Sequence, residues 1–220
     1  ESSRSEGLAV ASWNLFREGL FSSDPDEPLR VDAKGLERLD YSALAQGFQV
    51  TEANPMVGLE GRFQLLKALG GALQADAELF GEEIARPGRL FDYWRAAGST
   101  VRAPLVLRAL QRGLGGIWPG RLALTIAGGE INLGDAWHYP SWGAALSVDS
   151  IVPFHKLSQW LSYSLLEPLQ EAGLHVTAID ELTGLAEYRN GGLMLDSGLL
   201  ELRDPTQGGF SYNPGSPLII

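Results

Sequence analysis

Apolar side chains recur every three or four residues from Leu59 to Leu73, and this spacing constrains the fold more than any other feature. It matches the turn of an α-helix with one apolar face, so we predict a helix over residues 59–78, after a turn at Asn54 and Pro55. Similar signals predict helices over residues 8–18, 104–111 and 154–169. The expected fold class is therefore mainly α.

A short β hairpin is predicted within this helical chain. Residues 122–126 and 130–133 are two short strand-like runs on either side of Gly128 and Gly129, which favour a tight turn. An α+β fold is the alternative, because residues 192–202 are long enough to form strands, although their alternation is poor. The 27 glycines and 12 prolines predict long irregular connections over residues 20–58 and 134–153.

The chain has 220 residues, of which 45% are apolar, and we expect one helical domain over residues 1–220. It starts at Glu1 without a methionine or a signal-peptide pattern and stops abruptly at Ile220, so we expect a fragment truncated at both ends. The longest uncharged stretch, residues 205–220, contains three prolines and predicts no membrane helix. We expect a soluble, cytoplasmic protein.

Composition excludes several kinds of chemistry. The sequence has no cysteine, which excludes disulfides, thiolate nucleophiles and cysteine-ligated metals. Its three histidines lack ligand-like helical spacing, and the common phosphate-loop, dinucleotide and zinc-protease motifs do not occur. We therefore expect no metal and no cofactor, and any catalysis must use oxygen and nitrogen groups.

Positive charge is concentrated in residues 86–121, which hold seven arginines and one acidic residue in a chain of net charge −10. This cationic segment has two interpretations. Its arginines attract phosphate, or they cover solvated helix faces, which is the interpretation that we favour. The net acidity argues against general nucleic-acid binding, so nucleic acid is not an expected partner.

The first candidate site lies on the helix predicted over residues 154–169. At helical spacing, Lys156, Gln159 and Tyr163 share one face, opposite the leucines of the same helix. Lys156 is the only lysine after Lys67, which suggests a site that needs a compact charge. A surface lysine fits the composition equally well.

Two further clusters are rich in polar and aromatic side chains. A turn predicted over residues 182–192 carries two glycines after the side chains of Glu187, Tyr188, Arg189 and Asn190. The loop after the hairpin carries Asp135, Trp137, His138 and Tyr139. Both clusters fit the binding of a sugar or phosphate, and both also fit ordinary structural loops.

Several longer stretches of sequence are specific enough to indicate a protein family. They include Asn54-Pro-Met-Val-Gly-Leu-Glu-Gly-Arg62, Ile117-Trp-Pro-Gly-Arg121, Pro153-Phe-His-Lys-Leu-Ser-Gln-Trp160 and Thr183-Gly-Leu-Ala-Glu-Tyr-Arg-Asn-Gly-Gly192. Over nearly the whole chain, the sequence resembles a family of bacterial and fungal uracil-catabolism proteins. This family is typified by the fourth protein of the fungal URC pathway and has long been catalogued as a domain of unknown function.

A weaker similarity concerns the order of these motifs. A Leu-rich Glu-x-Arg helix, an aspartate loop, a Lys-x-x-Gln helix and an acid-Tyr-Arg turn look like those of the queuosine-salvage nucleotide glycosidases. That family has Asp-Tyr-Arg-Val-Pro where this chain has Glu187-Tyr-Arg-Asn-Gly191. The similarity implies a helical fold distantly like that of DNA glycosylases.

Together these resemblances imply an enzyme of uracil and pyrimidine catabolism. The implied reaction is that of an N-glycosidase-type hydrolase, which cleaves an N-ribosyl bond in a ribose-phosphate derivative of ring-opened uracil. The implied partner is therefore a small nucleotide or ribose-phosphate substrate. The alternative is a non-catalytic nucleotide-binding or scaffold subunit of a uracil-breakdown assembly.

Such a bond breaks through an oxocarbenium-like state, which requires a carboxylate, a donor for the leaving nitrogen and a cation for the phosphate. We expect Glu187 to stabilise or attack the anomeric carbon, Asp135 to activate water or orient the sugar, and Lys156 to contact an anion or the leaving group. The expected ligand-binding residues are His155, Gln159, Arg189, Tyr188, Asn190 and His138. Alternatively, Lys156 only pairs with Glu187 and locks the helix to the turn.

Overall fold

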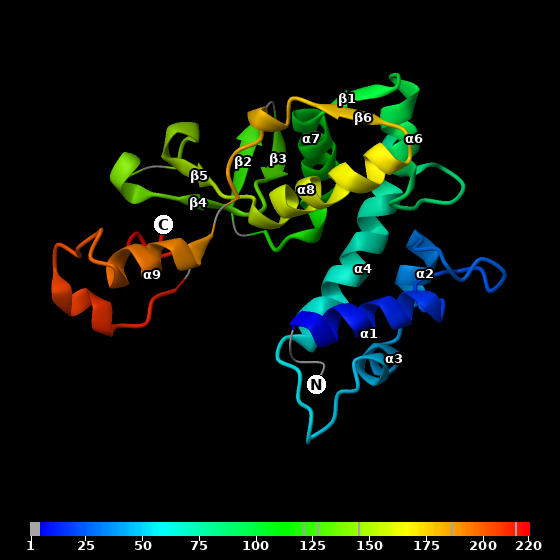
Figure 1. Ribbon diagram of the computed structural model, residues 1–220, viewed down its shortest axis with the longest axis horizontal. Helices are drawn as coiled ribbons and strands as arrows, with labels where there is room; N and C mark the ends of the chain where they lie inside the picture. The colour runs from blue at the N-terminus through cyan, green and yellow to red at the C-terminus, as the bar shows by residue number, and fades with distance from the viewer. Residues whose placement is uncertain (1–4, 121, 127, 145, 186, 214) are drawn as a thin grey trace.

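The computed structural model describes residues 5–120, 122–126, 128–144, 146–185, 187–213 and 215–220. Within this part the protein is mainly α (Figure 1). The helices are α1 (Ser5–Arg17), α2 (Ala33–Arg38), α3 (Tyr41–Gly47), α4 (Leu59–Ala75), α5 (Ala77–Phe80), α6 (Arg89–Ala96), α7 (Ala103–Leu114), α8 (Lys156–Glu171) and α9 (Tyr188–Asp196). Short 3₁₀ helices cover Gly115–Ile117, Pro140–Trp142, Val148–Ser150, Ile179–Glu181 and Pro205–Gly209.

The strands of the described residues form three separate pairs. Parallel β1 (Thr100–Arg102) and β6 (His175–Thr177) align Val101 with Val176. The predicted hairpin is confirmed as β2 (Ala123–Ile126) and β3 (Gly129–Asn132). A further antiparallel pair, β4 (Ala136–His138) and β5 (Ile151–Pro153), aligns Ala136 with Pro153. The mainly α prediction is confirmed.

The alternative α+β fold is wrong. Residues 192–202 contain no strand within the described chain, because their first part belongs to α9. The connections over residues 20–58 and 134–153 are largely irregular, as expected, but α2 and α3 interrupt the first and β4 and β5 the second. The two short helices start at aspartate caps, in which Asp32 accepts from the Gly35 N–H and Asp40 from the Ala43 N–H.

The core consists of two clusters of buried side chains. The larger one surrounds α7, which packs against α4, α8 and β1, and its fully buried members include Phe80, Val106 and Leu174. The smaller one joins α1 and α3 to the start of α4 through Leu15, Leu44 and other apolar residues. Helix α4 contributes to both clusters and thereby connects them.

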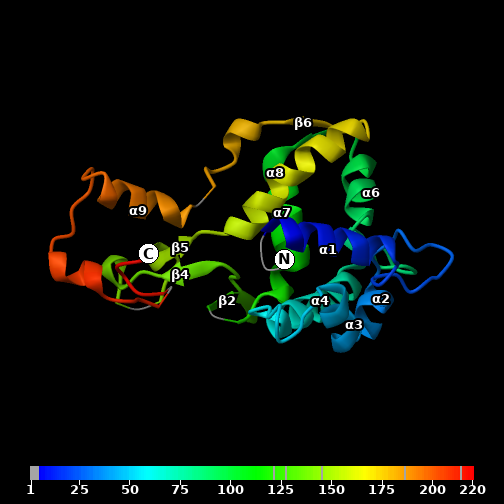
Figure 2. The same ribbon diagram turned by 60° about the horizontal axis from the view of Figure 1, so that its bottom comes forward.

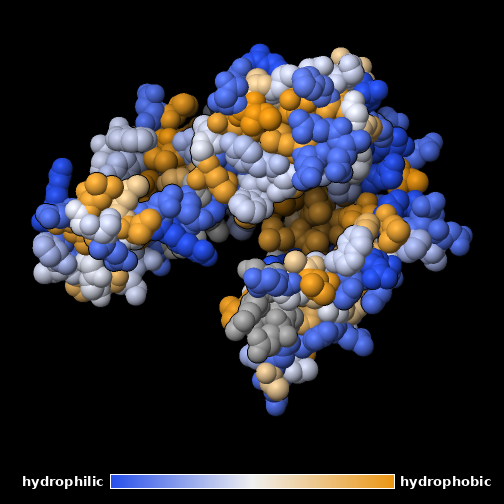
Figure 3. Space-filling model, viewed as in Figure 1, coloured by the Kyte–Doolittle hydropathy of each residue, from blue (hydrophilic) through white to orange (hydrophobic). Residues whose placement is uncertain are grey.

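The two ribbon views agree on the arrangement of the elements. Helices α1 and α3 lie at the start of α4, and α2 packs against a later part of α4 (Figures 1 and 2). Helices α6, α7 and α8 lie toward the other end of α4. The pair β4–β5, α9 and the C-terminal segment form a lobe to one side. Between the surfaces over α8 and α1, the molecule is hollowed and apolar (Figure 3). None of the described helices has the length and apolar character needed to cross a membrane.

Candidate functional site

Asp135 positions the start of α8. The β4–β5 register places Asp135 beside the end of β5, where its backbone carbonyl accepts from the N–H groups of Phe154 and His155, at 3.1 and 2.9 Å. Its carboxylate Oδ2 accepts from the Lys156 N–H at 3.0 Å, and its Oδ1 accepts from the Trp137 indole at 3.3 Å. The residue before α8, His155, does not cap the helix with its side chain. Asp135 takes over this role and satisfies N–H groups at the start of the helix.

Lys156 and Glu187 form an ion pair across two segments of the fold. Lys156 Nζ lies 3.3 Å from Glu187 Oε2, and the two side chains are 30% and 34% exposed. The second Glu187 oxygen, Oε1, accepts from the Arg189 N–H at 3.1 Å, and Glu187 thereby caps α9. Lys156, which stands alone as a lysine in this part of the sequence, is thus held beside a carboxylate.

Electrostatics keeps Glu187 ionised. The backbone N–H of Arg189 is the largest cause that lowers the pKa of Glu187, and the hydrogen bond and charge of Lys156 lower it further. Partial burial acts in the opposite direction but does not outweigh these contacts. The carboxylate is therefore negatively charged at neutral pH and can stabilise a nearby positive charge.

Gln159 lies one helical turn after Lys156 and is only 7% exposed. Its Nε2 donates to the Phe154 carbonyl at 3.0 Å, whereas its buried Oε1 has no hydrogen-bond partner among the described residues. A buried amide oxygen without a donor costs free energy, so it is the kind of acceptor that a ligand hydroxyl or N–H can satisfy.

His155 precedes α8 in a left-handed backbone conformation, with φ 43°, which is unusual for a residue other than glycine. Burial is the main cause that lowers the pKa of its imidazole, and the charge of Asp135 opposes this effect. The ring is therefore neutral at neutral pH, and it lies next to Lys156 in the chain.

The other predicted residues differ in their relation to this pair: the charge of Arg189 reaches Glu187 and lowers its pKa, whereas His138 is bound elsewhere. His138 Nε2 lies 2.9 Å from the Gly143 carbonyl and holds the loop after β4. Arg189 and Asn190 are exposed in the first turn of α9. Tyr188 begins α9, and its side chain lies outside the described part of the structure.

The turn predicted over residues 182–192 ends earlier than expected. Residues from Tyr188 onward are helical, because the Glu187 carboxylate caps α9 and stabilises its first turn despite the two glycines. The segment before Glu187 is tied to α8 by the Tyr163 hydroxyl, which donates to the Thr183 carbonyl at 3.0 Å. The tie supports the position of Glu187 opposite Lys156.

One contact of the site was missed in the sequence. Trp137 donates to Asp135, although only its aromatic character had suggested a role. The signal was the spacing of two residues, which places alternate side chains of an extended chain on the same face. Among the described residues, no group of three histidine, aspartate or glutamate side chains can hold a metal ion.

Comparisons with known proteins place the chain in a family. Residues 1–214 match a family described as "Protein of unknown function (DUF1688)". The chain is 45% identical over 214 residues to "Uracil catabolism protein 4" of Lachancea kluyveri, covering 91% of this chain and 48% of that protein. It is 44% identical over 222 residues to "Protein urg3" of Schizosaccharomyces pombe, covering 99% and 51%.

The chain thus spans about half the length of the curated relatives it matches. No solved structure gives a significant match, so the likeness to DNA glycosylases stays a prediction. With a family match over nearly all of its length and relatives above 40% identity, the chain belongs to the DUF1688 family of proteins of unknown function.

Proposed function

We propose that this protein acts in uracil catabolism and hydrolyses the N-ribosyl bond of a ribose-phosphate derivative of ring-opened uracil. The pathway is supported by the name of the Lachancea kluyveri relative, which is 45% identical to this chain. The reaction class rests on one observation, the ionised Glu187 carboxylate held 3.3 Å from the Lys156 ammonium.

The proposed reaction breaks the bond between the anomeric carbon and nitrogen. Water supplies the oxygen that bonds to this carbon and one proton for the leaving nitrogen. Positive charge develops on the sugar as the bond breaks, and the Glu187 carboxylate stabilises it. Lys156 contacts the anionic group or the leaving nitrogen, where its ammonium donates hydrogen bonds.

The neighbouring residues take supporting roles in this proposal. Asp135 positions Lys156, because its carboxylate accepts from the Lys156 N–H and from the Trp137 indole. His155 has a lowered pKa, so its neutral ring is suited to accept a proton from water. The buried Oε1 of Gln159 accepts from a sugar hydroxyl.

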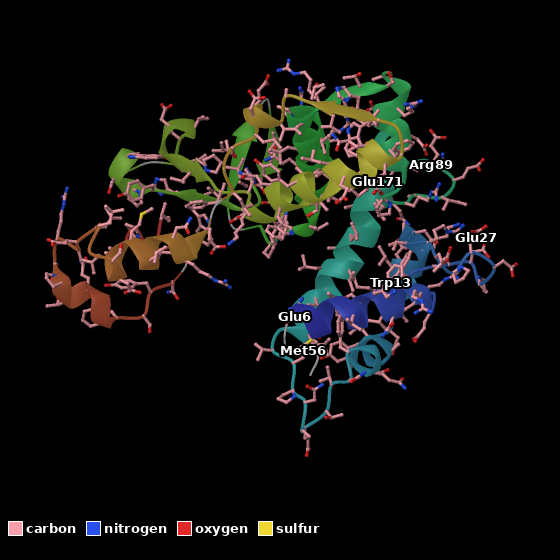
Figure 4. The ribbon with its side chains drawn as sticks, viewed as in Figure 1. Glu6, Trp13, Glu27, Met56, Arg89 and Glu171 are labelled. Carbon is pink, nitrogen blue, oxygen red and sulfur yellow. The ribbon has the colours of Figure 1, made fainter. Side chains whose placement is uncertain are left out.

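The decisive experiment measures ribose phosphate released from uridine monophosphate and from its ring-opened product. We expect the intact protein to release it and Glu187→Gln to lower turnover by about 10² or more, because electrostatic stabilisation of a transition state has this magnitude. Glu171→Gln is the matched control, since it makes the same chemical change at the exposed end of α8 (Figure 4). Equal turnover in both variants excludes the assignment of Glu187.

Lys156→Met separates ligand binding from architecture. If Lys156 contacts substrate, the variant stays folded and loses affinity or turnover. If the pair only locks α8 to α9, the variant is less stable than the parent protein but keeps its affinity for the substrate. Absence of ribose-phosphate release from every substrate, together with tight nucleotide binding, favours the non-catalytic binding subunit.

A further inference from the structure

A cavity lies away from the Lys156–Glu187 pair. It has a volume of about 940 Å³ and is lined by residues of α5, α6, β1 and α7. Lys156 begins α8, whereas β6, which follows α8, pairs with β1 at the cavity. A helix of 16 residues spans about 24 Å, so the two places are well separated. In Figure 4, Arg89 lies on the side of the molecule opposite to the lobe of α9.

Arginines of the cationic segment converge on this cavity. Arg102, Arg108 and Arg112 follow one another at intervals of six and four residues and line it from the start and one face of α7. Arg89 lines it from α6. The absent Cβ of Gly81 leaves room for the Arg89 side chain, because a Cβ there would lie 3.3 Å from Nε.

Three of these guanidinium groups are already oriented by acidic side chains. Arg89 pairs with Asp92 at 3.2 Å, and Arg112 pairs with Asp76 at 2.8 Å and with a second acid, Glu78. Arg102 pairs with Glu181. A guanidinium has five N–H donors, so these pairs leave donors for a ligand while they restrict the side chains.

Arg108 and Trp94 both line the cavity, and both carry N–H donors without an acceptor among the described residues. Within the described chain, the exposed Arg108 guanidinium has no ion pair or hydrogen-bond acceptor. Trp94 is only 4% exposed, and its buried indole Nε1 has no acceptor among the described groups. A buried indole N–H normally has a partner, so Trp94 is an observation independent of the charges.

We propose that this cavity binds a small molecule that carries a phosphate or carboxylate on an apolar or aromatic body. The oxyanion contacts Arg108 and neighbouring guanidinium groups, whose planar donors match its oxygens. The apolar body packs against Leu105, Ala109 and the ring of Tyr93, which also line the cavity. The volume falls within the range of small-molecule sites. This inference does not depend on the proposed hydrolase reaction.

Calorimetric titration of the intact protein at low ionic strength tests the proposal. The probes are inorganic phosphate, phenyl phosphate and phenylacetate, and we expect saturable binding of at least one. Arg108→Ala should weaken it about tenfold, the loss expected for a charge-assisted hydrogen bond. Arg62→Ala on α4 removes the same charge outside the cavity and should change the affinity less than about twofold.

The three probes also distinguish the ligand class. Phenyl phosphate binding more tightly than phenylacetate identifies a phosphate site, and the reverse identifies a carboxylate site. Bound probe should shift the indole N–H resonance of Trp94 in an NMR spectrum, and binding should persist in Lys156→Met. The proposal is overturned if no probe saturates, if both arginine variants weaken binding equally, or if the Trp94 resonance does not move.

Discussion

Replacing Asp32 should strongly destabilise the N-terminal part of the fold. Asp32 is 1% exposed and precedes α2, a helix that packs on α4. Its carboxylate accepts from the backbone N–H groups of Ser23 and Gly35, both at 2.9 Å, and from Arg30 Nε at 3.0 Å. One buried side chain therefore holds a loop, a helix terminus and a partly buried guanidinium.

The size of the effect follows from these contacts. Loss of a helix cap costs about 1 kcal/mol, and loss of one partner of a buried ion pair costs about 3–5 kcal/mol. These contributions overlap, so we expect Asp32→Ala to lower the free energy of unfolding by about 3–5 kcal/mol. Asp32→Asn can keep the cap on the Gly35 N–H, but its NH₂ group would face the Ser23 and Arg30 donors in place of Oδ2, so we expect a loss of about 3 kcal/mol.

The pH dependence gives a second test of Asp32. Burial is the largest single effect and raises the pKa of Asp32, but the hydrogen bonds from Ser23, Gly35 and Arg30 together outweigh it and lower the pKa. A carboxyl group with a lower pKa in the folded state stabilises the fold above its unfolded pKa of about 3.9. This stabilisation is lost as the pH falls through the folded pKa, and Asp32→Asn should lack that loss.

Urea unfolding followed by circular dichroism, at pH 7 and between about pH 3 and 5, measures both effects. Asp26→Asn is the matched control, because Asp26 is exposed in the same loop. The reasoning is refuted if Asp32→Ala unfolds within about 0.5 kcal/mol of the parent protein. It is also refuted if Asp32→Asn keeps the full acid-dependent loss of stability.

Three further substitutions test local features by urea unfolding. Gly35→Ala should lower the free energy of unfolding by about 1–3 kcal/mol or more, because its Cβ would lie 2.2 Å from the Phe21 carbonyl oxygen. An unchanged urea midpoint of unfolding would contradict this close contact. Gln159→Leu should change stability by less than about 1 kcal/mol, because it removes both a hydrogen bond and an unpartnered oxygen, yet it should lower turnover about tenfold. His155→Gly should be as stable as the parent, or up to about 1 kcal/mol more stable, because glycine adopts φ 43° without strain. The parent should lose stability as the pH falls below about 6.5, since the unfolded histidine takes up a proton before the folded one, and His155→Gly should lose less.

Local sequence patterns predicted the long helices and the hairpin. Apolar spacing of three and four residues is a property of one segment, so α1, α4, α7 and α8 were found within a few residues of their ends. The two glycines between short strand-like runs identified β2 and β3 for the same reason. Helices α2 and α3 have only six and seven residues, which is too short for a periodic pattern. The capping aspartates before them were the one local signal in the sequence, and they were not recognised.

In the candidate site, too, the sequence identified individual residues but left the contacts between them open. The sequence identified Lys156 as an isolated lysine and Glu187 as an acid in a polar cluster, but they are 31 residues apart. Their pairing was one of the alternatives left open from the sequence, and the tertiary structure shows it. The β4–β5 register seats Asp135 at the start of α8, and the tie from Tyr163 to Thr183 holds the segment before Glu187.

The sequence by itself determined where the four longest helices lie, which side chains carry charge, and that thiol chemistry is absent. The tertiary structure decided between the alternatives: Asp135 accepts from the N–H groups at the start of α8, Glu187 pairs with Lys156, and arginines of the cationic segment line a cavity. The physical reason is the distance along the chain over which each feature is encoded. Helix periodicity is encoded between neighbouring residues, whereas a hydrogen bond between distant segments depends on the packing of everything between them.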